Sequence, residues 1–382
     1  MKTFFQRLLI TAVISTTPLL ANADKNAVDK VEGSLSVMVL GSGGPVATAK
    51  GRASAGYLLF ADGKPRILMD VGGGTFQRLA KSGVNIKDLD IVLLSHLHLD
   101  HTADLSATFK TIYFHNNIAR SSGAIPADEG RTAAINIYGP KETSYKGDNG
   151  TVYPNGTVIY PSTVDYAHDH YSVGPTPANP TAKPGTERYL TAFVNAISDD
   201  DGPMGAGTNV SQFAYKAHGL ETDWKNIHTR TVIYSEGGLT ISYIPVMHGP
   251  VPAVAYRIDY KGHSIVYSGD TSSISPNMQI ISNNADLLIY DTAITDTLPA
   301  NPLFHILHTS PTRMGQVATA ANVGTLVLSH LTPVTDPRIK EIKSAVRAQG
   351  FTGKIKAAKD LQVYNLGDKH KHKHKHKNKH DD

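Results

Sequence analysis

The segment Ser95–His101 constrains this chain more than any other, because it holds four metal-binding side chains within six residues: His96, His98, Asp100 and His101. It follows Asp90–Leu94, a largely apolar run short enough for a buried strand. A strand that ends in such a cluster delivers imidazoles and a carboxylate to one point at a sheet edge. Imidazole suits zinc and iron, and an added carboxylate is typical of a site that keeps a position open for water. The segment therefore predicts a metallohydrolase.

Further candidate ligands follow apolar runs later in the chain, and each stands where such a run ends: His248, Asp270 and His330. A single carboxylate such as Asp270 can bridge two metals about 3.5–4 Å apart, the spacing that two-metal hydrolases use. The chain contains no cysteine, so every protein ligand is His, Asp or Glu.

The coarse pattern of the chain mixes strands and helices. Strands are expected near residues 36–40, 56–60, 66–70, 90–94, 136–140, 239–244, 253–258, 264–268, 287–290 and 326–329. Helices are expected near residues 74–81, 187–197, 278–284, 312–322 and 337–349. Because hairpins occur in both halves, the pattern predicts two sheets flanked by helices.

The N-terminus resembles a secretory signal. Lys2 and Arg7 precede the apolar stretch Leu8–Leu20, and small residues at Ala21 and Ala23 predict cleavage before Asp24. The alternative is an uncleaved anchor helix. No later stretch is apolar enough to span a membrane, so we expect no membrane span after cleavage and a periplasmic or secreted protein.

The remaining chain divides into a hydrolase domain at 24–366 and a tail at 367–382 that alternates Lys with His. The tail is low in complexity and expected to be disordered. Residues 145–230 are rich in Pro and Gly, and we interpret them as an insertion that caps or borders the site. The alternative is a surface excursion without a role in the site.

The formal charge of +4 is misleading, because the signal and the tail carry much of it. Without the signal and the tail, the formal net charge of the chain is near −2. This charge predicts no basic face, so a nucleic-acid partner is not expected. We expect a small anionic ester as substrate and allow for a homodimer. Lys50 and Arg52 could meet such an anion, although solvated loop charges are the simpler reading.

Taken together, His-x-His-x-Asp-His, a His before Gly-Pro, Gly-Asp-Thr and a final Ser-His resemble the metallo-β-lactamase superfamily, nearest its ribonuclease Z branch with arylsulfatase and phosphodiesterase relatives. The resemblance covers residues 36–115 and 236–365. It implies an α+β fold, the four-layer αββα sandwich, with two divalent metal ions, usually zinc, with manganese or iron as alternatives. It assigns one metal to His96, His98 and His248, the other to Asp100, His101 and His330, and a bridging role to Asp270.

His308 extends the resemblance. In the ribonuclease Z branch a histidine at this place contacts the scissile phosphate and protonates the leaving oxygen, and His308 stands 22 residues before His330. A histidine free of metal suits general-acid work at neutral pH. The alternative is a helix-capping or packing histidine. Asp100 is expected to orient the nucleophile as well as bind metal.

Two departures argue against tRNA processing. Only 21 residues separate His248 from Asp270, too few for the family's Gly-rich arm, and Asp291 replaces the Glu of the family's His-Glu-Ala-Thr stretch. We therefore expect an exported hydrolase of small or aryl phosphodiesters or sulfate esters, in which metal-activated hydroxide attacks phosphorus or sulfur. The alternatives are a lactone or β-lactam acyl hydrolase, a tRNA 3′-processing nuclease, and an exported protein that only binds metal.

Overall fold

Alternate residues of the first strand, β1 (Leu35–Gly41), pack into two different hydrophobic cores. Val37 and Val39 face a second sheet, whereas Met38 and Leu40 face helices, because successive side chains of a strand point to opposite faces. A strand buried on both faces belongs in the interior of a layered fold. The computed structural model describes residues 26–86, 89–113, 134–142, 160–171 and 215–367.

The N-terminal sheet has seven strands among the described residues. In spatial order they are β14 (Val363–Leu366), β1, β2 (Gly56–Ala61), β3 (Lys64–Val71), β4 (Ile91–Leu93), β5 (Ile135–Pro140) and β6 (Tyr215–Leu220). The pairs from β14 to β3 are antiparallel and those from β3 to β6 are parallel.

The C-terminal sheet repeats this plan, again with seven strands in the described ranges. Their order is β13 (Lys354–Ala357), β12 (Thr325–Ser329), β11 (Leu287–Asp291), β10 (His263–Tyr267), β9 (Val251–Tyr260), β8 (Leu239–His248) and β7 (Thr231–Glu236). Strands β7 to β10 are antiparallel, and β10 to β13 are parallel. Because parallel strands share one carboxyl edge, residues that follow β10, β11 and β12 gather there.

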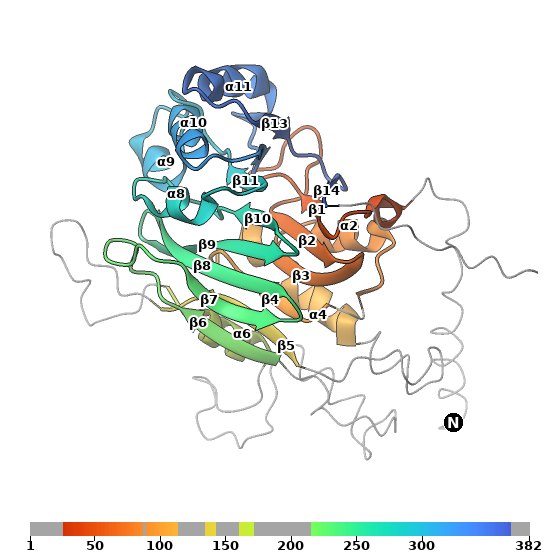
Figure 1. The fold of residues 1–382 in the computed structure, drawn as a ribbon. Helices are drawn as coiled ribbons and strands as arrows, with labels where there is room; N and C mark the ends of the chain where they lie inside the picture. The colour runs from red at the N-terminus through yellow and green to blue at the C-terminus, as the bar shows by residue number, and fades with distance from the viewer. Residues whose placement is uncertain (1–25, 87–88, 114–133, 143–159, 172–214, 368–382) are drawn as a thin grey trace, which may run out of the picture.

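Helices cover the outer face of each sheet (Figure 1). The N-terminal sheet carries α2 (Thr75–Ser82), α4 (Leu105–Tyr113) and α6 (Thr163–Tyr171), and a single turn, α3 (Leu99–Thr102), precedes α4. The C-terminal sheet carries α8 (Asn277–Ser282), α10 (Pro311–Ala320) and α11 (Ile339–Ala348), with α9 (Pro302–Leu307) between β11 and α10. Two 3-10 turns complete the set: η1 (Ala27–Lys30) and η5 (Asp336–Arg338).

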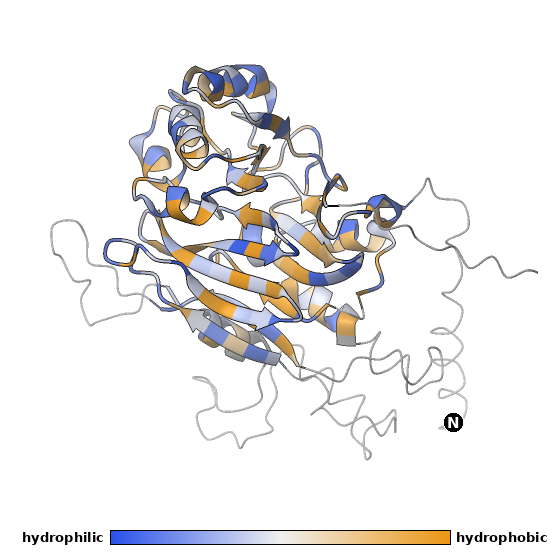
Figure 2. Cartoon of the chain, viewed as in Figure 1, coloured by the Kyte–Doolittle hydropathy of each residue, from blue (hydrophilic) through white to orange (hydrophobic). Residues whose placement is uncertain are grey.

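The resulting order of layers is helix, sheet, sheet, helix, which confirms the predicted αββα sandwich. In Figure 2 polar residues interrupt the apolar ones along β8 and β9, although almost every residue of both strands is buried. None of the helices in the described ranges combines the length and hydropathy of a membrane span.

The range predicted as an insertion, 145–230, contains two elements of the sandwich itself. Strand β6 pairs in parallel with β5, and α6 packs Ala167 into the core beneath the N-terminal sheet. The sequence does not predict β6, because the side chains of this strand are mostly half-buried and form no apolar run. The predicted helix at 187–197, the signal at 1–23 and the tail after residue 368 lie outside the described residues.

Candidate metal centre

The loop after β4 brings its ligands to the carboxyl edge of the N-terminal sheet. His98 is the N-cap of α3, and its carbonyl accepts a hydrogen bond from the His101 N–H at 2.9 Å. One helical turn therefore presents His98 and His101 on the same side, since residues three apart are neighbours on a helix. The His96 ring precedes the turn and is fully buried.

The second sheet supplies the remaining ligands from three strand ends. His248 is the last residue of β8, Asp270 lies three residues after β10, and His330 directly follows β12. His330 has a φ of 59°, a left-handed conformation that turns its ring toward the other sheet. Gly269, with a φ of 56°, makes the corresponding turn before Asp270. All three side chains are buried.

The structure places His96, His98 and His248 in one cluster. His98 Nδ1 lies 3.0 Å from His96 Nε2 and 3.4 Å from His248 Nε2. Burial lowers the pKa of His248 to about 4, so its ring is neutral at pH 7 and offers a lone pair. Its Nδ1 donates to the carbonyl of Leu307 at 2.8 Å, which leaves Nε2 as the free nitrogen.

A second cluster joins Asp100, His101, His330 and Asp270. His330 Nε2 lies 3.1 Å from Asp100 Oδ2, 3.3 Å from His101 Nε2 and 3.3 Å from Asp270 Oδ2. The same Asp270 Oδ2 lies 3.9 Å from His96 Nε2 and 3.8 Å from His248 Nε2. Asp270 therefore stands between the clusters, where the sequence predicts a bridge.

These donors fit two divalent metal ions. A tetrahedral ion with bonds of about 2.1 Å has ligand atoms about 3.4 Å apart, close to the separations within each cluster. Asp270 Oδ1 is buried without a hydrogen-bond partner, which a buried carboxylate oxygen does not tolerate unless a cation lies nearby. The donor set, imidazole with carboxylate, suits zinc, manganese and iron alike.

Asp70, which sequence inspection did not select, supports the second cluster. It is fully buried at the end of β3, and its Oδ2 accepts hydrogen bonds at 2.6 Å from His101 Nδ1, Ser95 Oγ and Tyr267 Oη. A metal-binding histidine commonly donates its second nitrogen to a carboxylate, which fixes the ring and its tautomer. The positive φ of Asp70, 49°, is the signal of a constrained position that only the structure reveals.

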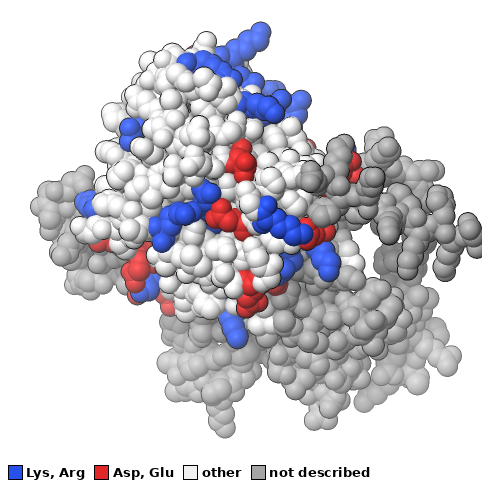
Figure 3. All heavy atoms as spheres, viewed as in Figure 1, with Lys and Arg blue, Asp and Glu red and all other residues white. Residues whose placement is uncertain are grey.

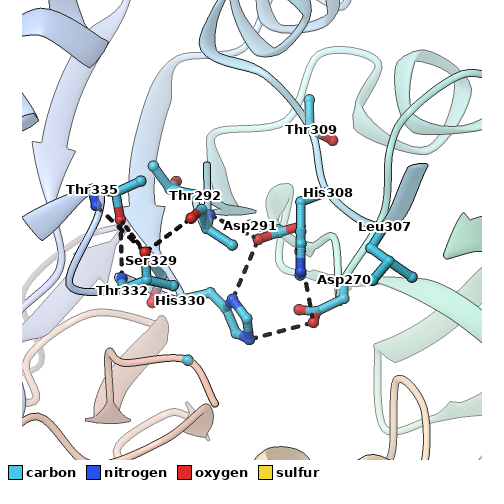
Figure 4. Close-up of polar contacts among 12 residues, drawn as sticks. Asp270, Asp291, Thr292, Leu307, His308, Thr309, Ser329, His330, Thr332 and Thr335 are labelled. Atoms are coloured by element: carbon cyan, nitrogen blue, oxygen red, sulfur yellow. Dashed lines mark hydrogen bonds and ion pairs between the residues drawn. The ribbon is translucent and has the colours of Figure 1, made fainter. Parts of the chain in front are cut away.

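His308 lies beside the second cluster with Asp291 as its partner (Figure 4). His308 Nδ1 donates to Asp291 Oδ2 at 2.8 Å and lies 3.9 Å from Asp270 Oδ2. Burial opposes its charge, but the carboxylates of Asp291 and Asp270 outweigh burial and raise the pKa of His308. Asp291 Oδ1 also lies 3.4 Å from His330 Nδ1, so one carboxylate lies next to both rings.

Lys50 and Arg52 are not at the site. Both pair with the nearly buried Asp336, at 2.9 Å each, and Arg52 also donates to the carbonyl of Ala358. Through Asp336, these two residues connect the loop after β1 to the segment that follows His330. His168 and His170 repeat the His-x-His spacing of the ligand segment, and they lie in α6 at positions where the structure describes no side chains.

Two family models match parts of the chain. The Beta-lactamase superfamily domain matches residues 178–331, and the Anti-Pycsar protein Apyc1 model matches residues 35–126. Among curated relatives, the Ribonuclease Z of Mycobacterium avium (strain 104) is 26% identical over 333 residues, which cover 86% of this chain and 96% of the relative. The Ribonuclease Z of Mycobacterium tuberculosis (strain ATCC 25618 / H37Rv) is 25% identical over 335 residues, covering 86% and 96%.

Three solved structures share this fold with TM-scores slightly above 0.5. The metallo-β-lactamase fold protein YhfI from Bacillus subtilis has a TM-score of 0.55 and 22% identity, covering 86% of this chain and 98% of its own. The short form of human tRNase Z has a TM-score of 0.55 and 18% identity, with the same coverage. Unliganded yeast PDE1 has a TM-score of 0.52 and 13% identity, covering 87% and 100%.

The expected function, an exported hydrolase of small or aryl phosphodiesters or sulfates, is wrong in the light of these relatives. The relatives named Ribonuclease Z match this chain over nearly their whole length. Ribonuclease Z activity on tRNA is the function that we did not expect from the sequence. The short interval between His248 and Asp270 holds the β9–β10 hairpin, and the candidate ligands on either side of it still meet at one centre. The chain has the metallo-β-lactamase fold, and it is similar to the metal-dependent hydrolases of that superfamily.

Proposed function

We propose that this protein is a ribonuclease Z-type phosphodiesterase that cleaves an RNA phosphodiester bond, with precursor tRNA 3′ ends as the first substrate to test. The observation that carries the proposal is the His308–Asp291 pair, 2.8 Å apart, beside both clusters of metal ligands. The similarity to relatives named Ribonuclease Z over 86% of this chain supports it.

Two bound divalent ions, zinc in the first instance, would be held by the two clusters and would supply a hydroxide nucleophile at neutral pH and neutralise phosphate charge. Cleavage also needs a proton for the departing ribose oxygen. His308 is placed to give it, because Asp291 holds Nδ1 and leaves Nε2 available. The carboxylates of Asp291 and Asp270 raise the pKa of His308, which favours the protonated ring that the transfer needs. Asp100, less buried than Asp270, is placed to orient the attacking water.

The test compares the wild type with His308→Ala on a precursor tRNA carrying a 3′ trailer. We expect zinc-dependent cleavage by the wild type, loss of cleavage with a chelator, and a fall in kcat of about 10²–10⁴-fold for the variant with both metals retained. His305→Ala is the matched control, since His305 contacts only the carbonyl of Pro299 among the hydrogen bonds of the described residues. Its kcat should stay near that of the wild type.

Two results would contradict the proposal. The first is no RNA cleavage by protein shown by elemental analysis to hold two metals. The second is a higher kcat/KM on a lactone or β-lactam, with His308→Ala leaving that turnover unchanged, which would indicate acyl chemistry at the same site.

Location and assembly are separate proposals. The pattern of residues 2–23 supports export to the periplasm or beyond, which fractionation and N-terminal sequencing of the mature chain would test. A homodimer is tested by light scattering of the purified protein.

A further inference from the structure

Asp360 is an acidic residue in a basic part of the chain. From Arg338 to Gly367 the sequence holds seven Lys or Arg residues and two acidic ones, Glu341 and Asp360. Lys and Arg side chains gather at the surface over α11 in Figure 3. The Asp360 side chain, between the edge strands β13 and β14, is only 14% exposed. A carboxylate withdrawn from water needs hydrogen-bond partners, and those of Asp360 lie in the N-terminal part of the chain.

The Asp360 carboxylate binds both ends of the loop between β1 and β2. Its Oδ1 accepts hydrogen bonds from the Ser42 N–H at 3.1 Å and from the Ser42 hydroxyl at 2.7 Å. Its Oδ2 accepts from the Ala53 N–H at 2.9 Å and from Arg78 Nε at 3.1 Å. Ser42 directly follows β1, and Ala53 lies three residues before β2. One side chain therefore fixes where the loop leaves the first strand and where it returns to the second.

This loop pairs with the chain that follows His330. The Leu331 N–H donates to the carbonyl of Ser42 at 2.9 Å, and the Gly44 N–H donates to the carbonyl of Leu331 at 3.2 Å. The two hydrogen bonds form a parallel bridge between Gly43 and Leu331. The backbone on the C-terminal side of His330 is thus joined to the loop that Asp360 holds.

His330 depends on such support because its backbone is left-handed. A residue with a Cβ keeps a φ of 59° only where its surroundings fix it. The loop also packs against the ring, since an added Cβ at Gly44 would stand 2.8 Å from His330 Cε1. On the N-terminal side of His330, the Ser329 hydroxyl lies 2.6 Å from Tyr57 Oη of the other sheet. The position of the His330 ring among the second-cluster ligands therefore depends on contacts with the N-terminal sheet and its loop.

We propose that Asp360 is a positioning residue for the second metal site, which acts on His330 through Ser42 and Leu331. The groups that donate to Asp360 include no candidate metal ligand, so its effect is indirect. The inference concerns metal affinity, and it holds whether or not the substrate is RNA.

Loss of the carboxylate should weaken one metal site and spare the other. Without Asp360 the Ser42 loop can shift, and Leu331 and His330 can shift with it. The first cluster, His96, His98 and His248, has no contact with this loop among the hydrogen bonds of the described residues. Groups that orient a metal ligand change metal affinity by about 10–100-fold, and the lower end is expected for a group that acts through an intervening segment.

The test measures the zinc affinity of both sites in Asp360→Ala by competition with a chromogenic chelator. His248→Ala and His330→Ala each lack a ligand of one cluster, so they assign the two dissociation constants to the two sites. We expect the Kd of the second site to rise about tenfold and that of the first site to stay near the wild-type value. A loss of stability alone would not separate the two sites in this way.

Ser42→Ala is a second, milder variant. It removes the hydrogen bond from the Ser42 hydroxyl to Asp360 and the one that Arg52 Nη1 donates to that hydroxyl at 2.6 Å. The Ser42 N–H still binds Asp360, so the Kd of the second site should rise by a smaller factor than in Asp360→Ala.

Asp286→Ala is the matched control. Asp286 also accepts hydrogen bonds from the N–H and the hydroxyl of one serine, Ser264, at 2.8 and 3.3 Å. It precedes β11, at the end of that strand opposite Asp291 and the metal centre. This variant should lower Tm and leave both dissociation constants near those of the wild type.

Three results would overturn the inference: a second-site Kd in folded Asp360→Ala equal to that of the wild type, an equal rise at both sites, or the same split in Asp286→Ala. If Asp360→Ala does not fold, an unchanged second-site Kd in Ser42→Ala overturns it as well. RNA cleavage is not measured here, so these results leave the proposed function to its own test.

Discussion

At the scale of single residues, the metal centre depends on groups that hold the ligands as much as on the ligands. Asp70 orients His101, Asp291 orients His308, and the Leu307 carbonyl orients His248. Each partner fixes which ring nitrogen is free, and a ring with a fixed tautomer binds metal without first paying the entropy of ordering.

Asp70→Asn should weaken the second metal site. Oδ2 of Asp70 accepts three hydrogen bonds, and an amide cannot accept them all, so the His101 ring loses its support. We expect metal affinity to fall about 10–100-fold, measured by competition with a chromogenic chelator. Tyr267→Phe removes one of those donors and should have a smaller effect. A dissociation constant within twofold of the wild type in Asp70→Asn would show that this carboxylate is not needed.

Gly44→Ala should displace His330. An added Cβ would stand 2.8 Å from the His330 Cε1 atom, closer than real contacts allow, so either the ring or the turn must move. Displacing a reacting group by about 1 Å costs about 10²-fold in rate, which a steady-state assay with excess zinc would detect. Gly73→Ala is the control because its Cβ would meet nothing within 4 Å. Equal activity in both variants would refute the steric argument.

At the scale of elements, long buried strands were predictable and edge strands were not. Strands β1 to β4 and β8 to β12 all contain apolar runs, and we expected them close to their observed positions. At the sheet edges, β13 exposes both of its lysines, and β7 has no buried residue. Helix α9 has no buried residue, so its sequence has no amphipathic pattern that would predict a helix.

The turn η5 contributes an acid-sensitive contact between elements. Although burial opposes ionisation, hydrogen bonds from Arg52 and Lys50 lower the pKa of Asp336. A lowered folded-state pKa means that the contact stabilises the protein above the unfolded value of about 3.9. The stabilisation is lost as the pH falls through the folded value.

Asp336→Asn should therefore reduce the free energy of unfolding by about 1.5–3 kcal/mol at pH 7. The difference from the wild type should shrink as the pH falls below about 4, in urea titrations at several pH values. Glu341→Gln is the control. The Glu341 carboxylate is exposed and lies 4.0 Å from Arg338 Nε, and a surface ion pair of this kind contributes little to stability. A difference for Asp336→Asn that stays constant down to pH 2 would contradict the assignment.

At the scale of the whole molecule, the metal centre joins the two sheets. Four of the seven candidate ligands come from the loop after β4, and the other three come from the ends of β8, β10 and β12. Beneath them, Tyr57 of one sheet bonds to Ser329 of the other at 2.6 Å, and its ring packs against Tyr267 at 4.8 Å. Ions held across this interface would stabilise the docking of the sheets as well as supply the chemistry of the reaction.

Metal removal should therefore lower stability. An ion at a free concentration a hundredfold above its dissociation constant adds about 2.7 kcal/mol per site to the free energy of unfolding. We expect a chelator to lower Tm, followed by circular dichroism, and expect the decrease to be smaller in His248→Ala, which lacks a ligand of the first cluster. An unchanged Tm after complete removal of metal would show that the sheets dock without it.

The sequence by itself determined the layered fold and the ligands His96, His98, Asp100, His101, His248, Asp270 and His330 as candidates, because each follows a local signal, an apolar run that ends in a metal-binding residue. Tertiary structure alone decided the roles of Asp70 and Asp291. These depend on contacts between residues as far apart as Asp70 and Tyr267. Such contacts arise only when two sheets pack, and no local pattern encodes them.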